Sequence, residues 1–347
     1  MRALTVVPEQ AGSLAVTEVP DPEPRDGELL VEGVAVGVCG TDHEIAQGDY
    51  GSAPAGDERL VIGHESLGRV REAPEGSGFS PGDLVVGVVR RPDPVPCGAC
   101  ARGQFDMCRN GRFTERGIKD LHGYASERWT VEADYAVRLD PSLERVGVLL
   151  EPTTVVYKAW QQVDAVGGRS WFEPQKALVT GAGPIGLLAA MIGVQRGLEV
   201  HVLDRSTDGP KPDLVRDLGA SYHTDPVREV AAAVRPDVVI EATGAAEVVF
   251  DAIGATGAYG VTCLTGVTSS RRLRIDAGAV NRDLVLENDA VVGTVNANLE
   301  HFRGAAEVLA KADRDWLGRM ITRRVPLERA TEAFERQDDD VKVVVEL

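Results

Sequence analysis

ALVTGAGPIGLLAA, residues 177–190, joins a short apolar run to the glycine spacing G-x-G-x-x-G and then to a second apolar run. This order predicts a β-strand, a tight turn and a helix that holds a dinucleotide pyrophosphate at its N-terminus. Gly181 allows the turn, Gly183 lets the pyrophosphate approach the backbone, and Gly186 lets helix and strand pack closely. Pro184 and Ile185 lie between the second and third glycines. These five residues form the centre of a predicted cofactor site.

A carboxylate follows at the distance that this motif requires. The apolar run 199–203 ends at Asp204, 23 residues after Gly181. A carboxylate there accepts both ribose hydroxyls of an adenosine and repels a 2′-phosphate. Arg205 comes next and could neutralise such a phosphate, but the repulsion from the neighbouring carboxylate is direct. We therefore expect NAD as the preferred cofactor, with NADP use possible.

Apolar runs and helical patterns alternate from Lys176 onward. Strands are expected at 177–179, 199–203, 237–241 and 260–264, and helices at 183–196, 212–218 and 245–253. Such alternation predicts a parallel, doubly wound sheet of the α/β class, as in a Rossmann domain. A further helix is expected at 154–166, where the character of the sequence changes.

Residues 1–150 read instead as short β segments broken by Gly and Pro, for example at 29–34 and 83–88. No long helical period occurs there, so we expect an irregular, antiparallel, β-rich domain. A helix at 299–312 and a strand at 341–345 follow the parallel block, and this last strand is expected to complete the N-terminal domain. We predict a discontinuous catalytic domain, 1–153 with 297–347, and a dinucleotide-binding domain, 154–296.

The composition argues against several classes of partner. The chain has 347 residues, enough for two domains of about 100–200 residues each. Its formal net charge is −17, so we expect no nucleic-acid binding and no docking on anionic lipid. No apolar stretch approaches the length of about 18–20 residues that spans a membrane, and the N-terminus lacks a signal-peptide pattern. We therefore expect a cytoplasmic protein with no membrane partner.

Three segments carry side chains of the kinds that bind metals. They are VCGTDHE (residues 38–44), GHE (63–65) and LEP (150–152), the last at the predicted domain junction. Thiolate, neutral imidazole and carboxylate all bind zinc, and three protein ligands with an open position is the catalytic arrangement. Each residue alone has an ordinary structural explanation, such as a small buried cysteine. Together, and upstream of a dinucleotide motif, the three segments favour a catalytic zinc site.

Three of the five cysteines, Cys97, Cys100 and Cys108, lie within twelve residues. In a reducing compartment such a cluster is more often a metal clip than a disulfide framework. A closed structural zinc needs four ligands, so a fourth must come from elsewhere in the chain. The candidates are Asp93, Asp106 and Glu115. The alternative is a loop without metal that carries three free thiols.

Taken in order, these segments resemble those of the zinc-dependent medium-chain alcohol dehydrogenases. The matching segments are Cys39-Gly40-Thr41-Asp42, Gly63-His64-Glu65, the Cys97–Cys108 loop, Glu151-Pro152 and Gly181–Gly186. Within that family the chain most resembles the archaeal-type glucose (aldose) 1-dehydrogenases. The closer matches are Val89-Arg90-Arg91-Pro92, Glu115-Arg116-Gly117-Ile118, Leu121-His122-Gly123, Val292-Gly293-Thr294-Val295-Asn296 and Asp338-Asp339-Asp340. The resemblance covers nearly the whole chain. It implies a GroES-like catalytic domain beside the Rossmann domain, and a homodimer or homotetramer.

The resemblance also implies roles for single residues. Cys39, His64 and Glu151 would hold the catalytic zinc, with Glu65 as an outer or exchangeable ligand. Thr41 looks like the hydroxyl that relays the substrate proton. Asp42 would orient His64. Glu44 stands where the family usually has its relay histidine, and it joins Thr41 and Glu65 as a candidate catalytic residue.

Two further sites follow from the resemblance. The predicted cofactor site also includes Thr243 and Asn296. In the cysteine loop, the commonest family pattern has four cysteines, and Pro94 stands at the spacing of the first. The resemblance therefore supports a structural zinc but does not supply its fourth ligand.

A sugar is the substrate that the resemblance implies, oxidised at C1 to a lactone while NAD(P) takes the hydride. Glu115, Glu151 and Asn296 are the expected sugar contacts. Two positions depart from some relatives: Val89 replaces a sugar-binding Asn and Val155 replaces an Asp. Another aldose, a deoxy sugar or a cyclitol could therefore fit as well as glucose.

Three alternatives remain open. The first is a zinc-dependent polyol, cyclitol or secondary alcohol dehydrogenase, although Glu115 and Glu151 favour a polyhydroxylated substrate. The second is a zinc-free quinone reductase-like enzyme, against which the Cys39 and His64 pair argues. The third is an NAD-binding protein without catalysis, and the joint presence of Cys39, Thr41 and His64 argues against it.

Overall fold

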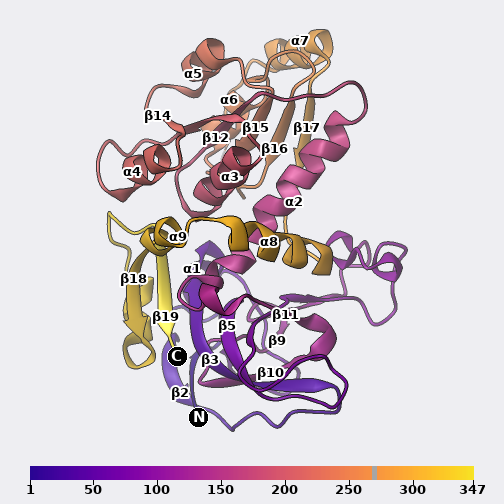
Figure 1. The fold of residues 1–347 in the computed structure, drawn as a ribbon, viewed down its shortest axis with the longest axis vertical. Helices are drawn as coiled ribbons and strands as arrows, with labels where there is room; N and C mark the ends of the chain where they lie inside the picture. Colours follow the sequence, from indigo (N-terminus) through magenta and orange to yellow (C-terminus); the bar gives the residue numbers. More distant parts are fainter. Residues whose placement is uncertain (268–271) are drawn as a thin grey trace. The chain divides into compact units, whose positions relative to one another are not determined.

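In the computed structural model, which describes residues 1–267 and 272–347, the chain divides into two units (Figure 1). The first unit contains Met1–Glu151 and Asn296–Leu347, and the second contains Pro152–Val295. These limits differ from the predicted domain limits by two residues at the first boundary and by one at the second. The exact limits of the two domains stay a prediction.

Parallel strands form the sheet of the second unit, in the order β14-β13-β12-β15-β16-β17. Their bounds are β12 (Lys176–Thr180), β13 (Glu199–Leu203), β14 (Ser221–His223), β15 (Val238–Glu241), β16 (Val261–Leu264) and β17 (Ala290–Gly293). This arrangement confirms the predicted doubly wound sheet. The strand order reverses between β12 and β15, and in such sheets ligands bind beyond the carboxyl ends of the strands at that point.

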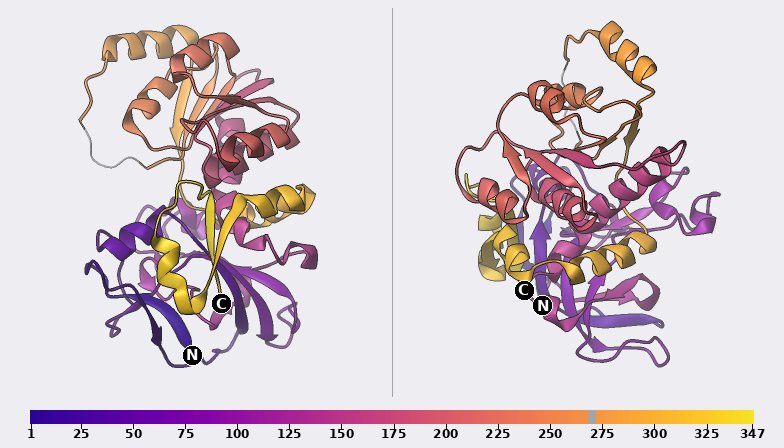
Figure 2. Two further views of the ribbon diagram at one scale, coloured as in Figure 1. Left: turned by 90° about the vertical axis from the view of Figure 1, so that its left-hand side faces the viewer. Right: turned by 45° about the horizontal axis from the view of Figure 1, so that its top comes forward.

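Helices lie on both faces of this sheet (Figure 2). They are α2 (Leu150–Gly167), α3 (Pro184–Gln195), α4 (Pro210–Asp217), α5 (Val227–Val234), α6 (Ala246–Ala252) and α7 (Ala277–Glu287). On one face α5 buries Val227 and Val230 against Leu178, Leu203 and Val239 of the strands. The helices expected at 154–166, 183–196, 212–218 and 245–253 are confirmed with shifted ends, whereas α5, α7, β14 and β17 had not been predicted.

The main sheet of the first unit has the order β11-β6-β5-β3-β19-β18, with β10 paired to β3. Its strands are β3 (Glu28–Val38), β5 (Glu65–Glu72), β6 (Leu84–Gly87), β10 (Arg128–Glu132), β11 (Ala136–Arg138), β18 (Ile321–Pro326) and β19 (Lys342–Glu346). All pairs are antiparallel except β18 with β19. Strand β19 pairs with β3, so the prediction that the last strand completes the N-terminal unit is confirmed.

Smaller elements complete the first unit. Two three-stranded sheets contain β1 (Arg2–Val6), β2 (Ala15–Glu18) and β4 (Leu60–Val61), and β7 (Arg90–Arg91), β8 (Thr114–Arg116) and β9 (Asp120–Leu121). The helices are α1 (Gly40–Gln47), α8 (Leu299–Lys311) and α9 (Arg314–Met320), of which α8 matches the expected helix at 299–312. Single turns include η1 (Cys100–Arg102) and η2 (Phe105–Met107). Across residues 1–267 and 272–347, no helix has the length and apolar character needed to cross a membrane.

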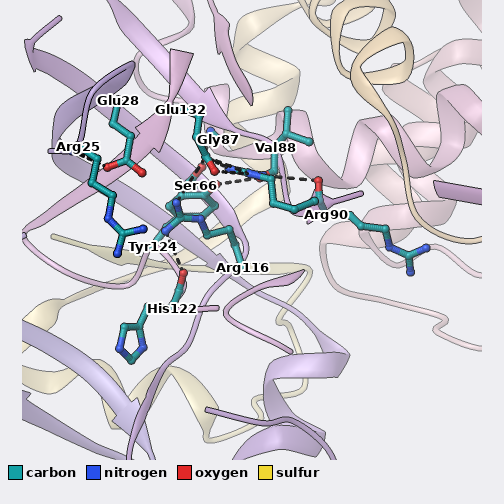
Figure 3. A network of polar contacts seen from close by, with 11 residues as sticks. Arg25, Glu28, Ser66, Gly87, Val88, Arg90, Arg116, His122, Tyr124 and Glu132 are labelled. Carbon is teal, nitrogen blue, oxygen red and sulfur yellow. Dashed lines mark hydrogen bonds and ion pairs between the residues drawn. The ribbon is translucent and has the colours of Figure 1, made fainter. Parts of the chain in front are cut away.

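A network of buried arginines ties β7, β8 and β10 together (Figure 3). Arg91 Nη2 donates to Glu132 Oε2 over 2.6 Å, and Arg116 Nη2 lies 3.7 Å from the same oxygen. The Tyr124 hydroxyl donates to the Val88 carbonyl over 2.9 Å. Burial opposes ionisation of Glu132, but hydrogen bonds and charge from Arg91 outweigh it and lower the pKa of Glu132 to about 2. The carboxylate is therefore a stabilising partner for two buried cations.

We expect Glu132→Gln to destabilise the protein near neutral pH and to lose this effect in acid. Because the folded-state pKa is depressed from 4.5 to about 2, the carboxylate contributes stability above about pH 4.5 and loses it as the pH falls towards 2. Thermal denaturation of both proteins from about pH 7 to about pH 3 measures this, and the difference between the two Tm values should shrink steadily as the pH falls below about 4.5. A Tm difference that stays constant across the range contradicts the assignment.

Candidate functional site

Cys39, His64 and Glu65 converge in the first unit. Cys39 follows the end of β3, His64 precedes β5 and Glu65 begins it. Cys39 Sγ and His64 Nε2 are 3.1 Å apart, and one ligand atom from each of the three residues lies within 4.8 Å of the others. His64 is 6% and Glu65 2% exposed. A thiolate, an imidazole and a carboxylate at this spacing fit a zinc ion. We refer to these three residues as the Cys39 cluster.

Asp42 contacts both Cys39 and His64 of the Cys39 cluster. Its Oδ2 accepts a hydrogen bond from the Cys39 backbone N–H over 3.0 Å, which caps α1, and its Oδ1 lies 3.4 Å from His64 Nδ1. Burial opposes charge on both groups. The neighbouring charges nevertheless lower the pKa of Asp42 and raise the pKa of His64, to which Cys39 and Asp42 both contribute. A carboxylate behind a metal-binding histidine fixes its ring, so Asp42 lies where the resemblance implies.

Lys342 places a positive charge beside the Glu65 carboxylate of the Cys39 cluster. No motif in the sequence pointed to this residue. Strand β19 carries this residue to β3, where its ammonium group forms an ion pair with Glu65 Oε2 and donates to the Val38 carbonyl over 3.0 Å. Lys342 is 1% exposed. A Cβ atom at Gly37 would overlap the Glu65 carboxylate, so the missing side chain makes room for the pair. The signal in the sequence was one lysine inside the apolar run Val341–Val345.

The other residues expected at the zinc site lie nearby in the first unit. Thr41 is half-buried in the first turn of α1, and Glu44 is exposed one turn further on. Glu151 is the second residue of α2, outside the three converging ligands of the Cys39 cluster. Burial and the charge of Glu65 raise the pKa of Glu151 to about 7, against the opposing effect of His64. The structure thus groups Glu65 with Cys39 and His64, and a ligand role for Glu151 stays a prediction.

Two of the expected sugar contacts touch each other. Asn296 Nδ2 donates to Glu115 Oε1 over 2.6 Å, although 181 residues separate them. Glu115 is 4% exposed and also receives hydrogen bonds from Arg90. Burial, with a smaller contribution from the charge of Glu115, raises the pKa of Tyr50. Asn296 belongs to the first unit, and its predicted contact with the cofactor stays a prediction.

The cysteine loop gathers its three thiols. Cys97, Cys100 and Cys108 place their sulfur atoms within 4.8 Å of one another, with Cys97 and Cys100 3.7 Å apart. Backbone N–H groups, first that of Arg109, lower the pKa of Cys97 to about 6, while burial raises the pKa of Cys100. Such an arrangement suits a thiolate-bound metal.

The three candidates for a fourth ligand all bind other groups. Asp93 accepts from the Val95 N–H and from Asn110, each over 2.8 Å. Asp106 accepts from Asn298 Nδ2 over 2.8 Å. Glu115 is held by Arg90 and Asn296. Within the described parts of the chain, none of these carboxylates joins the three thiols.

The glycine motif forms the turn between β12 and α3. Gly181 has φ +94°, in the left-handed region that suits glycine. A Cβ atom at Gly186 would overlap the Gly181 carbonyl oxygen, whereas one at Gly183 would meet nothing within 4 Å. Gly183 caps α3 without a side-chain acceptor and Pro184 is its first residue, so the N-terminal N–H groups stay open for phosphate. Thr243 lies beside the turn, 3.0 Å from where a Gly181 Cβ would be.

Asp204 directly follows β13, as expected, but its carboxylate already accepts two backbone hydrogen bonds and lies beside a lysine. Its Oδ2 accepts from the Ala182 N–H over 2.7 Å and its Oδ1 from the Ser206 N–H over 3.0 Å. Lys211, at the start of α4, approaches Oδ1 to 3.6 Å. Arg205 is exposed. Lys211 was not foreseen, because seven residues and a turn separate it from Asp204 in the sequence.

Comparisons with known proteins show which families this chain resembles. Residues 144–347 match the family model described as glucose dehydrogenase C-terminus, and residues 25–141 match that of the alcohol dehydrogenase GroES-like domain. The chain is 43% identical to a glucose 1-dehydrogenase of Methanocella arvoryzae, covering 100% of this chain and 99% of the relative. It is 41% identical to that of Thermoproteus tenax, with the same coverage.

A solved structure is similar along its whole length. It is the glucose dehydrogenase of Haloferax mediterranei in complex with NADP, zinc and gluconolactone, with a TM-score of 0.92 and 36% identity. The match covers 100% of this chain and 99% of that one. The predicted combination of a GroES-like domain with a parallel-sheet dinucleotide domain is confirmed.

We expect Lys342→Met to cost about 3–5 kcal/mol of stability in the metal-free protein, because it leaves the Glu65 carboxylate buried without its partner. Zinc would then supply the missing positive charge. The rise in Tm on adding zinc should therefore be larger for the variant than for the wild type. Lys176→Met, which removes a surface pair with Glu199 at 3.7 Å, serves as the control and should cost about 1 kcal/mol or less. Equal zinc-induced shifts in wild type and Lys342→Met would refute the role of Lys342.

Two glycine variants should separate packing from cofactor binding. Gly186→Ala forces a methyl group onto the Gly181 carbonyl and should lower the stability by about 1–3 kcal/mol or more. Gly183→Ala has room, so it should cost no more than about 1 kcal/mol, through the weaker cap, while reducing NADH affinity at least about tenfold. Thermal denaturation and fluorescence titration with NADH measure the two effects. If Gly183→Ala binds NADH as tightly as the wild type does, the predicted role of Gly183 in cofactor binding is wrong.

Proposed function

Because this chain belongs to the glucose dehydrogenase family within the zinc-dependent alcohol dehydrogenases, we propose that it oxidises a glucose-like aldose at C1 and passes the hydride to NAD or NADP. The product is the lactone. The observation that carries the proposal is the Cys39 cluster, a largely buried set of zinc-ligand types in a chain that also has a dinucleotide-binding turn. The relatives named above are glucose 1-dehydrogenases, and one was solved with gluconolactone.

The Cys39 cluster would hold the catalytic zinc. Cys39 and His64 supply two ligands, and we propose that Glu65 and Glu151 exchange as the third. Zinc, when bound, acts as a Lewis acid that favours loss of a proton from a substrate hydroxyl. Asp42 keeps the His64 ring in place, and Lys342 balances the negative charge of Glu65.

In this proposal Thr41 relays the substrate proton: its hydroxyl accepts that proton while it donates its own to the next group. Its hydroxyl is half-buried in the first turn of α1, two residues after Cys39. Glu44 is exposed on the same helix and would pass the proton to solvent. NAD or NADP, when bound, accepts the hydride, and the chemistry of that step belongs to the cofactor.

Recognition of a sugar requires partners for several hydroxyl groups, because unpaired buried polar groups are costly. Glu115 and Asn296 supply carboxylate and amide groups at one place in the first unit, and Glu151 supplies another carboxylate. Val89 is 4% exposed and offers no hydrogen bond where some relatives carry an Asn. We therefore propose an aldose of the glucose type, with other aldoses and cyclitols as competitors.

For the cofactor we propose NAD as the favoured form, with NADP also accepted. Asp204, directly after β13, would supply the carboxylate that receives the ribose hydroxyls. Lys211 at 3.6 Å and the exposed Arg205 weaken its repulsion of a 2′-phosphate. The Haloferax relative was solved with NADP. We also propose a second, structural zinc on Cys97, Cys100 and Cys108, supported by their close approach.

A homodimer or homotetramer is part of the proposal. Strand β17 is an edge of the second sheet, and Val291 on it is 38% exposed. Helix α7, which precedes it in the chain, exposes Val285 to 65% and Leu286 to 69%. An apolar edge of this kind suits pairing with a second copy. All five cysteines are free, which agrees with the proposed cytoplasmic location.

The purified, zinc-loaded protein should reduce NAD in the presence of D-glucose, as measured by the absorbance of the reduced nicotinamide. A panel of aldoses, cyclitols, polyols and primary alcohols compares the substrate classes. Cys39→Ala and chelation should each lower turnover by about 1,000-fold or more, with NAD affinity unchanged. Cys263→Ala, a buried cysteine in β16 of the second unit, is the matched control. Turnover of polyols or alcohols without any aldose, or full activity in Cys39→Ala, would overturn the proposal.

A further inference from the structure

The Glu115 carboxylate is held by one oxygen only. Strands β7 and β8 place Arg90 directly opposite Glu115. Arg90 donates to Glu115 Oε1 from Nε over 3.1 Å and approaches it from Nη2 to 3.0 Å. Asn296 Nδ2 donates to the same oxygen over 2.6 Å. All three nitrogen atoms therefore surround Oε1.

The second oxygen of this carboxylate stays available. Among the described residues none donates a hydrogen bond to Glu115 Oε2, and this atom is not sealed from solvent. The residue itself is only 4% exposed, so a ligand reaching Oε2 would meet an acceptor whose direction is already fixed. A carboxylate accepts hydrogen bonds at both oxygens, and a sugar hydroxyl is a suitable donor.

Arg90 cannot easily turn away from Glu115. Its Nη1 donates to the Asp106 carbonyl over 3.1 Å, and its guanidinium lies 3.6 Å from the centre of the Phe113 ring. The side chain is thus held by an ion pair, a backbone acceptor and an aromatic face. Arginine keeps this geometry because its donors form a rigid, planar fork.

The neighbouring arginine makes none of these contacts. Arg91 is as buried as Arg90, both being 8% exposed, but it pairs with Glu132 and donates to the Val88 carbonyl over 2.8 Å. Figure 3 draws Arg90 pointing away from the Glu132 network. The two residues are adjacent on one strand with side chains on opposite sides, so Arg91 controls for charge, burial and position.

We propose that Arg90 is a positioning residue for substrate binding, which fixes Oε1 of Glu115 so that Oε2 is presented to a hydroxyl group of the sugar. This inference rests on the proposed function, because it assigns Glu115 to a polyhydroxylated substrate. Glu115 lies outside the Cys39 cluster, so the proposal assigns it to a hydroxyl other than the one at C1. Arg90 would then act on binding in the ground state and the transition state alike. Loss of such uniform binding raises KM and leaves kcat nearly unchanged.

The experiment compares Arg90→Met, Arg90→Lys, Arg91→Met, Glu115→Gln and the double variant Arg90→Met/Glu115→Gln. Steady-state kinetics with D-glucose, or with the aldose of the panel that the wild type oxidises best, gives kcat and KM, and thermal denaturation gives Tm. We expect Arg90→Met to raise KM about 10–100-fold with kcat within about threefold, as for a lost charge-assisted hydrogen bond. Arg90→Lys should restore part of the loss, because its ammonium can still pair with Oε1.

The double variant and the control decide between positioning and general destabilisation. If Arg90 acts through Glu115, the KM of the double variant should equal that of the worse single variant. Arg91→Met should lower Tm and leave KM unchanged. If the KM increases of the two single variants multiply in the double variant, Arg90 has no positioning role. Equal KM increases in Arg90→Met and Arg91→Met would lead to the same conclusion. A wild type without turnover of any aldose overturns the proposed function and this inference with it, whereas active wild type with an unaltered Arg90→Met overturns the inference alone.

Discussion

The first unit depends on pairing the charged side chains that it buries beside the Cys39 thiol. Asp42, His64, Glu65 and Lys342 are each between 1% and 6% exposed. A buried charge without a partner costs several kcal/mol, so each of these groups must be brought to another. Asp42 meets His64, and Glu65 meets Lys342. Strands β5, β3 and β19 must lie side by side for the second pair to form, so the sheet order and the charge pairing require each other.

Local patterns explain what the sequence predicted of the fold. The glycine motif, the alternation of strands with helices and the apolar run at 341–345 are each contained within a few residues, and all were found. Helix α1 was not, because GTDHEIAQ carries little apolar periodicity. It exists because Asp42 caps it and Ile45 is buried, both of which depend on tertiary packing. The short strands β14 and β17 were missed for the same reason: a strand of three or four residues is defined by its neighbour.

At the site, too, residues within short motifs were predicted, and partners from distant parts of the chain were not. Cys39, His64 and the glycines stand in recognisable motifs; the side chains of Cys39 and His64 converge, and the glycines form the turn before α3. Charged partners from elsewhere in the chain were not foreseen. Lys342 is 277 residues from Glu65, and Arg90 meets Glu115 across two strands of two and three residues. The fourth ligand of the cysteine loop could not be chosen from the sequence, because Asp93, Asp106 and Glu115 differ only in which donors surround them.

The place of β19 in the chain has a consequence for biosynthesis. Ribosomes make Glu65 long before Lys342, and the whole of Pro152–Val295 is translated between them. Until β19 emerges, the nascent first segment lacks the cation that pairs with Glu65, and β3 lacks one of its partner strands. The segment translated in the middle contains every strand of its own sheet, so that sheet does not wait for the end of the chain. Domains generally fold in the order in which they are made. Here the segment before Pro152 cannot complete its sheet until β19 has been translated, after the whole of Pro152–Val295.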